Sequence, residues 1–151
     1  MSETDFLDPR SVASATIEAA LERVLETMCF SAVMGPLHPD LVQPNLRGAA
    51  RVQFRGPTTG WVGVACDDRA ATCLARNFLG MEDVPAEQTT QFLGELANMI
   101  CGAVVSDFAA HGQYDLSSPE SMDPSVLTEV DGKRVDVELE EGFLSVIAHQ
   151  D

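Results

Sequence analysis

The sequence predicts an α+β domain in which a mainly antiparallel sheet is covered by long helices. Two long segments, 11–28 and 85–110, carry apolar residues at helical spacing. Short apolar or alternating runs joined by turn residues follow each of them, which is the pattern of a β-hairpin. Helices interleaved with hairpins imply a mainly antiparallel sheet. Because both halves follow this order, we expect two pseudo-duplicated helix–hairpin units.

The first helix is predicted within 11–28, after an acidic lead-in formed by residues 1–10 (MSETDFLDPR). Its apolar and acidic side chains fall on different sides. The apolar side holds Ile17, Leu21, Val24, Leu25 and Met28, and the acidic side holds Glu18, Glu22 and Glu26. A solvated surface explains the acidic side, and contact with a basic partner is the alternative. No second change of composition divides residues 11–151, which should form one domain.

A strand hairpin is predicted after a proline-rich connector at 35–45. Apolar and polar residues alternate in 51–55, as in a half-buried strand. The segment 61–66 (WVGVAC) is apolar throughout and predicts a more buried strand. Glycine and proline between the two runs supply the turn.

Two helices are predicted next. The first should begin at a cap formed by Asp67 or Asp68 and end before Gly80. The second follows the helix-start signal Glu82-Asp83-Val84-Pro85, with acids near the positive helix end and proline in the first turn. It should run to Ala110 and end before Gly112.

The C-terminal part predicts three strands, 125–130, 134–140 and 143–149, after the turn-rich connector LSSPESMDP. Asp131-Gly132 and Glu141-Gly142 are tight-turn dipeptides, so each should join two strands in a hairpin.

Charge excludes several classes of partner. The 151 residues include 9 basic and 24 acidic side chains, for a formal net charge of −15. Such a surface repels nucleic acid and anionic lipid, so neither should be a partner. No apolar run approaches the roughly 20 residues of a membrane span, and the N-terminus lacks the layout of a secretory signal. We therefore expect a cytoplasmic protein.

The four cysteines, Cys29, Cys66, Cys73 and Cys101, form no Cys-x-x-Cys pair and lie among apolar neighbours. Buried, reduced thiols are expected, as in the cytoplasm. The three histidines are scattered and show no metal-ligand spacing. The chain itself should therefore bind no metal and no cofactor.

The long helix at 85–110 predicts a functional face. One side, which should pack on the sheet, holds Leu93, Leu96, Ala97, Ile100 and Val104. The far side holds Gln91, Glu95, Asn98, Gly102, Ser106 and Ala109, with Val105 beside them. Glycine inside a helix costs about 1 kcal/mol relative to alanine and is more acceptable where another backbone must approach. This far side should be a partner-docking face, from which Glu95 and Asn98 project.

Glu95 and Asn98 suit one kind of chemistry. An asparagine amide does not titrate near neutral pH, but its donors and acceptor lie in a fixed plane and can hold a water in one orientation. In phosphoryl transfer a protein supplies mainly positioning and electrostatic stabilisation. A carboxylate one helical turn away could pair with a cation across the interface. By spacing alone, a chance polar pair on a solvated helix remains the alternative.

The stretch ELANMICG, residues 95–102, resembles the signature of the CheC/CheX/FliY family of chemotaxis phosphatases, and the chain looks most like CheX. The motif Glu-x-x-Asn-x-x-x-Gly is specific. The chain length, LETM at the end of the first helix, the LSSP segment and the closing hairpin agree with it in order.

This resemblance implies a phosphatase acting on the aspartyl phosphate of a response regulator such as CheY. Asn98 would orient the attacking water and Glu95 would pair with the active-site lysine of the regulator. The Mg²⁺ would belong to the regulator. The first helix has Leu21 and Leu25 where a second motif would need Asn, so one active site per chain is implied, and CheX-type members are typically homodimers joined through their sheets.

Two other functions stay open. The chain could be a non-catalytic binding module of the same fold that recognises a response regulator or a flagellar component. It could also be a redox or metal sensor that uses its cysteines.

Overall fold

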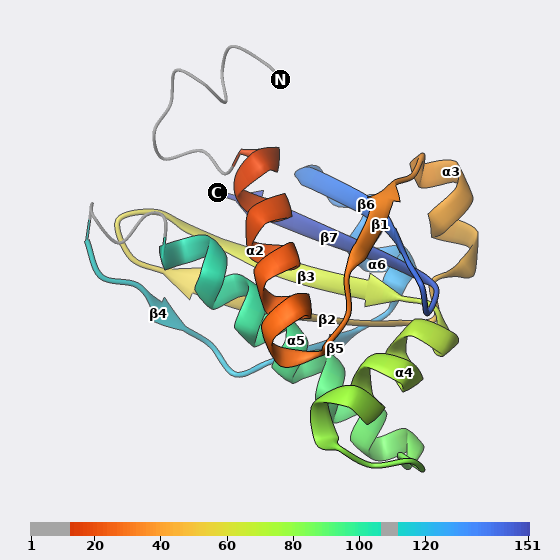
Figure 1. The fold of residues 1–151 in the computed structure, drawn as a ribbon. Helices are drawn as coiled ribbons and strands as arrows, with labels where there is room; N and C mark the ends of the chain where they lie inside the picture. Colours follow the sequence, from red (N-terminus) through yellow and green to blue (C-terminus); the bar gives the residue numbers. More distant parts are fainter. Residues whose placement is uncertain (1–12, 107–111) are drawn as a thin grey trace.

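A computed structural model describes residues 13–106 and 112–151 as one antiparallel sheet with helices on both faces (Figure 1). The strands are β1 (Val33–Pro36), β2 (Gly48–Arg55), β3 (Thr59–Cys66), β4 (Asp115–Leu116), β5 (Glu120–Met122), β6 (Lys133–Leu139) and β7 (Phe143–Gln150). The helices are α2 (Ser14–Met28), α3 (Pro39–Val42), the 3-10 turn η1 (Gln43–Asn45), α4 (Asp68–Leu79), α5 (Ala86–Ser106) and α6 (Pro124–Glu129). The α+β prediction is confirmed.

The sheet has an approximate internal symmetry. Its order is β1-β6-β7-β3-β2-β4, and β5 also pairs with β2. The first unit, α2 to β3, contributes the hairpin β2–β3, and the second, α5 to β7, contributes the hairpin β6–β7. Each unit also lends a short strand to the hairpin of the other, since β1 pairs with β6 while β4 and β5 pair with β2. The predicted pseudo-duplication is thus present in the topology.

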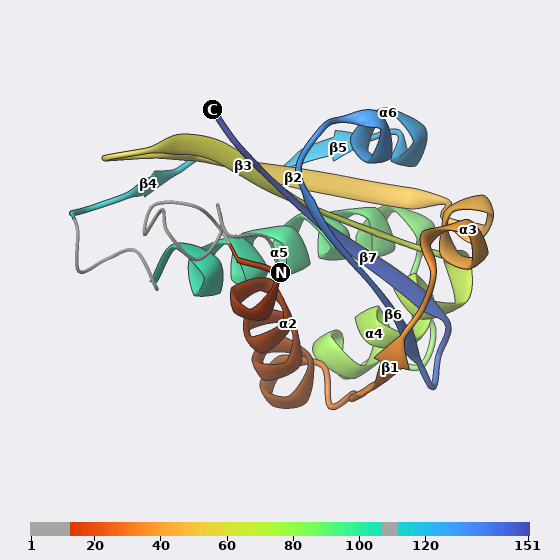
Figure 2. The same cartoon turned by 90° about the horizontal axis from the view of Figure 1, so that it is seen from above.

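The sheet buries both of its faces. The helices α2, α4 and α5 cover one face, and the short helices α3 and α6 lie on the other (Figure 2). On the second face Gly63 makes room for α6, because a Cβ there would lie 2.6 Å from a methyl group of Leu127. Each face therefore has its own apolar core.

The helix α5 packs as its periodicity predicts. The five side chains assigned to its sheet side are all buried. The helix α5 contacts β2 and β3 beneath it, and α2 and α4 beside it. This packing fixes which side of α5 faces away from the core.

The predicted strand at 125–130 is wrong, because this segment is the helix α6. The Asp123 carboxylate caps it by accepting from the Ser125 N–H at 2.9 Å, and Pro124 occupies the first turn, where its missing N–H costs nothing. The turn at Asp131-Gly132 consequently joins a helix to a strand. A segment of six residues is too short for apolar spacing to separate helix from strand.

The connectors predicted at 35–45 and 116–124 contain short strands and helices. β1 spans four residues, β4 two and β5 three. Such short strands form because they pair with the longer strands β6 and β2, and their own composition gives little sign of them.

A buried ion pair lies on the α3–α6 face. The Arg134 Nε–H donates to both carboxylate oxygens of Asp136 at 2.9 Å, and the Arg134 Nη1–H donates to Gln43 Oε1 at 3.1 Å. The Asp136 side chain is 3% exposed and that of Arg134 is 17% exposed. The hydrogen bond from Arg134 to Gln43 ties η1 to β6.

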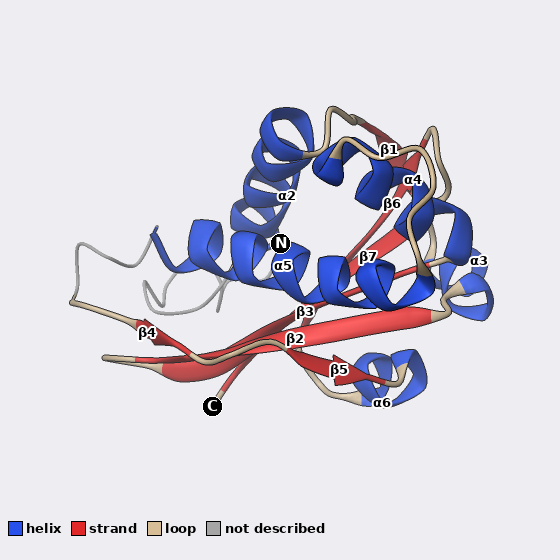
Figure 3. Ribbon diagram, turned by 90° about the horizontal axis from the view of Figure 1, so that it is seen from below, coloured by secondary structure: helices blue, strands red, loops and turns tan. Residues whose placement is uncertain are grey.

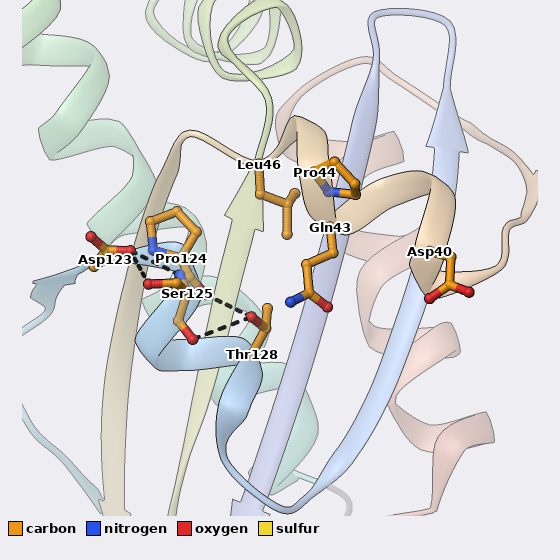
Figure 4. A pocket seen from close by; sticks show the side chains of 8 residues that line it. All are labelled: Asp40, Gln43, Pro44, Leu46, Asp123, Pro124, Ser125 and Thr128. Atoms are coloured by element: carbon orange, nitrogen blue, oxygen red, sulfur yellow. Dashed lines mark hydrogen bonds between the residues drawn. The ribbon is translucent and has the colours of Figure 1, made fainter.

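A cavity of about 640 Å³ opens on the same face, between η1 and α6 (Figure 4). Its lining is Asp40, Gln43, Pro44, Leu46, Asp123, Pro124, Ser125 and Thr128. Its two carboxylates and lack of a basic side chain make it a poor site for a phosphorylated ligand. The α5 side of the sheet is therefore the better place to look for phosphate chemistry.

Candidate functional site

The candidate site is built on α5, a helix of 21 residues. The hydroxyls of Thr89 and Thr90 donate to the carbonyls of Pro85 and Ala86, which supports the first turn. Glu87 places a negative charge near the positive end of the helix. Glu95 and Asn98 follow one turn apart in the middle of this rigid element.

Most residues of the predicted docking face are exposed or partly exposed to solvent. Gln91, Glu95 and Ser106 are exposed, and Asn98 and Gly102 are partly buried. Val105 is a correction, because it is only 7% exposed and packs in the core, on the flank of the helix. Ala109 lies outside the described residues.

The side chains of Glu95 and Asn98 have no bonding partner within the described part of the chain. Within residues 13–106 and 112–151, neither the Glu95 carboxylate nor the Asn98 amide makes a hydrogen bond or an ion pair. The Asn98 side chain is partly covered but not sealed in the core. Both groups are therefore free to bind atoms that another molecule supplies.

The segment 116–119 forms one wall of the site. It runs beside the stripe of α5 on which Gly94, Asn98 and Gly102 repeat every four residues. A Cβ on Gly94 would lie 2.8 Å from Pro119 Cβ, and one on Gly102 would lie 4.0 Å from Leu116 Cδ1. Asn98 stands between these two contacts, which explains why it is half-buried.

Ser117 fixes this wall to the sheet. Its N–H donates to the Gln53 carbonyl at 2.9 Å, and its Oγ accepts from the Gln53 N–H at 2.9 Å. Gly102 is the glycine of the predicted docking face, and the sequence makes no prediction for Gly94. The close neighbour of Gly94 is the chain's own Pro119. The proline and the glycine are the only signals of this contact, and they are 25 positions apart.

We expect Gly94→Ala to destabilise the protein by about 1 kcal/mol. The added methyl group would overlap the ring of Pro119, and overpacking costs about 1–3 kcal/mol, whereas the gain in helix propensity is about 1 kcal/mol. Urea unfolding measures the difference. Gly102→Ala is the control, because it meets no atom nearer than 4.0 Å and should be neutral or stabilising. Equal stabilisation by both changes would contradict the packing of Pro119 on α5.

The symmetry-related helix α2 presents no second site. Leu21 and Leu25, which stand where a second motif would need Asn, are both fully buried. Among the described helices, the Glu-x-x-Asn pair is thus confined to α5.

Three of the four cysteines, Cys29, Cys66 and Cys101, are buried as predicted, whereas Cys73 is only partly buried. Burial raises the pKa of the Cys101 thiol to about 12, and burial together with the Glu141 carboxylate raises the pKa of Cys29 to about 12. Burial, with Asp67 and Asp68 nearby, raises the pKa of Cys66 further. A thiol with a raised pKa is a poor nucleophile and metal ligand at neutral pH. In the part of the chain that the structure describes, no His/Cys/Asp/Glu group could hold a metal ion.

None of the described helices is both long enough and apolar enough to cross a membrane.

Comparison with known families shows where this fold belongs. Residues 49–139, more than half of the chain and including all of ELANMICG, match the family model described as "Chemotaxis phosphatase CheX". The chain belongs to the CheX family. A search of curated protein sequences finds no match.

Solved structures of CheX proteins share the fold. The chemotaxis protein CheX of Vibrio vulnificus is 18% identical with a TM-score of 0.73, over 91% of this chain and 95% of that one. A CheX of Desulfovibrio desulfuricans is 19% identical with a TM-score of 0.69, over 91% and 98%. A CheX–CheY–BeF3–Mg²⁺ complex from Borrelia burgdorferi is 16% identical with a TM-score of 0.67, over 90% and 96%. At these identities the similarity establishes the CheX fold alone.

Proposed function

We propose that this chain is a phosphatase that accelerates hydrolysis of the aspartyl phosphate of a CheY-like response regulator. One observation carries the proposal: an unpaired Glu95 and Asn98, one turn apart, on the open side of α5 in a CheX-family fold. The CheX–CheY complex of the Borrelia protein supports a regulator as the partner. No small-molecule cofactor is needed, and the Mg²⁺ would be held by the regulator.

The chemical role of Asn98 is positioning. Its Oδ1 would accept a hydrogen bond from the attacking water, and its Nδ2–H would donate to the phosphoryl group. Oxygen of the water then bonds to phosphorus as the bond from phosphorus to the aspartyl oxygen breaks. The regulator carboxylate leaves with the electron pair of that bond, and the protons of the water remain on the inorganic phosphate that is released. Holding the water in line removes orientational freedom before the reaction, which lowers the activation free energy.

Glu95 would anchor the complex. Its carboxylate lies one turn from Asn98 and is exposed, so it can pair with a cation of the partner without breaking an existing contact. The active-site lysine of a response regulator is the expected cation.

We expect Glu95→Ala to raise the KM for phosphorylated regulator about five- to tenfold, with a smaller change in kcat. This corresponds to about 1–1.4 kcal/mol, the range of a partly solvated ion pair. Steady-state phosphate release measures both constants. Glu129→Ala on α6 removes the same charge from the other face of the sheet and should leave KM unchanged. A fall in kcat alone would show that Glu95 acts in the chemical step and does not anchor the complex.

A screen of phosphorylated receiver domains from the same cell tests the proposal directly. The expected result is faster phosphate loss from at least one receiver when the protein is added in catalytic amounts. Stable binding without faster loss would instead identify the chain as a non-catalytic recognition module. No acceleration of any receiver would overturn the proposed activity.

We further propose that the protein forms a homodimer through its sheet, as the family resemblance implies. In the described part of the chain, β1 ends the sheet and pairs with β6 on one side alone, so its outer edge is open to another strand.

A further inference from the structure

Phe30 has an unusual backbone conformation at the end of α2. Its φ is +52°, and within the described residues it is the one non-glycine with a positive φ. This left-handed position after a helix normally holds glycine, because a Cβ is strained there. The helix α4 follows that rule and ends at Gly80, with φ +68°. A phenylalanine is therefore kept at a position where glycine would fit with less strain.

Packing of the Phe30 side chain within the fold does little to offset this strain. It is 75% exposed, the largest exposed fraction among the large apolar side chains of the described residues. Its neighbours in sequence point inward, since Cys29 is fully buried and Ser31 is 8% exposed. The aromatic ring is thus presented to solvent at a cost in backbone strain.

The turn that carries Phe30 is held rigidly. The N–H groups of Cys29 and Ser31 both donate to the Leu25 carbonyl, at 3.1 and 3.0 Å. The Ser31 hydroxyl lies 3.0 and 2.9 Å from the two carboxylate oxygens of Glu141, to which it donates. Because the backbone is fixed on both sides, the ring can be buried by a partner with little further loss of conformational entropy.

Further exposed apolar residues lie at or just after the C-terminal ends of α2 and α4. Met28 is 42% exposed although its helical spacing predicts a buried position, and Leu79 and Met81 are each 39% exposed. Met28 ends α2 and Leu79 ends α4. Figures 1 and 3 both show these two helix ends side by side. We call Met28, Phe30, Leu79 and Met81 the apolar corner.

The helix ends that carry the apolar corner are seen together with α5 in Figure 3. Figure 3 views α5 from the side that neither the sheet nor another helix covers. The ends of α2 and α4 lie along one flank of α5 in this view, and the segment from β4 to β5 lies along the other. A single globular partner seated on α5 would therefore meet the apolar corner as well.

We propose that Phe30, supported by the apolar corner, is the anchor through which the response regulator docks over Glu95 and Asn98. This inference rests on the proposed function. A chain of net charge −15 cannot rely on charge attraction to approach a partner whose own site is acidic, as the carboxylates that hold Mg²⁺ in the expected regulator would make it. Burial of an aromatic ring supplies affinity independently of charge, and rigid aromatic side chains are the usual centres of binding energy in interfaces.

The test measures binding of the beryllofluoride-loaded receiver domains from the same cell, whether or not the protein accelerates their phosphate loss. Phe30→Gly should raise the Kd for the receiver that binds at least tenfold, and should raise KM by a similar factor with kcat within twofold of wild type. Its Tm should be unchanged or higher, because glycine relieves the positive φ. Phe30→Asn, which also tolerates this conformation, should weaken binding equally, and Phe30→Tyr should restore it.

Leu41→Ala is the matched control. Leu41 is an exposed apolar residue, 59% accessible, on α3 at the opposite face of the sheet, and its loss should leave Kd unchanged. A Kd within twofold of wild type for both Phe30→Gly and Phe30→Asn would overturn the inference, whatever their Tm. Binding that depends on Phe30 without faster phosphate loss would overturn the proposed activity but not the docking surface. If the wild type binds no receiver, both are overturned.

Discussion

Asn98→Ala should lower the rate of receiver dephosphorylation by about a hundredfold or more while leaving the protein fully folded. Loss of one preorganised hydrogen-bonding group at a reacting centre costs about 2.7–4 kcal/mol of activation free energy, which is 100- to 1,000-fold in rate. The fold should be unaffected, because the amide has no hydrogen-bond partner among the described residues. Alanine is also the better helix former, by several tenths of a kcal/mol.

Single-turnover phosphate release at saturating protein measures this effect without interference from binding. Asn77→Ala is the control, since it makes the same change at an exposed position of α4 and should leave the rate near that of wild type. Circular dichroism and Tm would confirm that both variants are folded. A wild-type rate for Asn98→Ala would remove Asn98 from the chemistry and leave the chain as a binding module.

Long periodic elements could be predicted from the sequence, whereas short ones could not. The buried side of α5 follows directly from the spacing of Leu93, Ile100 and Val104, since 21 residues repeat the helical period several times. In contrast, β4 and β5 contain two and three residues and exist because β2 needs partners on its outer edge. The helix α6 was missed because six residues are too few for apolar spacing to distinguish a helix from a strand. Its cap, Asp123-Pro124, was the better local signal.

The chemical part of the candidate site was predictable, but its surroundings were not. Glu95 and Asn98 stand out because polar groups interrupt an apolar helix, and the family motif reinforces them. Nothing local to Pro119 shows that it packs on Gly94, because that contact joins residues far apart in the chain. Likewise, Met-Cys-Phe-Ser at 28–31 contains no glycine or asparagine to signal a left-handed turn at Phe30. Contacts between distant segments and the strain they impose appear only in three dimensions.

The largest expected loss of stability is on the other face of the sheet, at Asp136. Its carboxylate accepts two hydrogen bonds from Arg134 and is almost completely buried. Arg134 Nη2 is already buried without a hydrogen-bond partner, so the guanidinium lacks one hydrogen bond even before the carboxylate is removed. Removing the carboxylate would leave a mostly buried positive charge unpaired, which costs about 3–5 kcal/mol in such sites.

We therefore expect Asp136→Ala to lower the free energy of unfolding by about 3 kcal/mol, the low end of this range, because the Arg134 side chain keeps some contact with water. For a domain of this size, that loss corresponds to a fall in Tm of roughly 6–12 °C. Urea unfolding at neutral pH gives the free energy, and Glu138→Ala is the control, since it removes an exposed carboxylate two residues along the same strand. Equal stability of the two variants would show that the ion pair is solvated in the folded protein.

A double variant separates the value of the ion pair from the cost of breaking it. Arg134→Met combined with Asp136→Leu removes both charges and refills their volume with apolar atoms. Replacing a buried pair in this way is often neutral or stabilising, because neither partner then has to be taken out of water. The double variant should therefore recover most of the stability that Asp136→Ala loses. If it is as unstable as the single variant, the Arg134 hydrogen bond to Gln43, which joins η1 to β6, carries the stability instead of the charges.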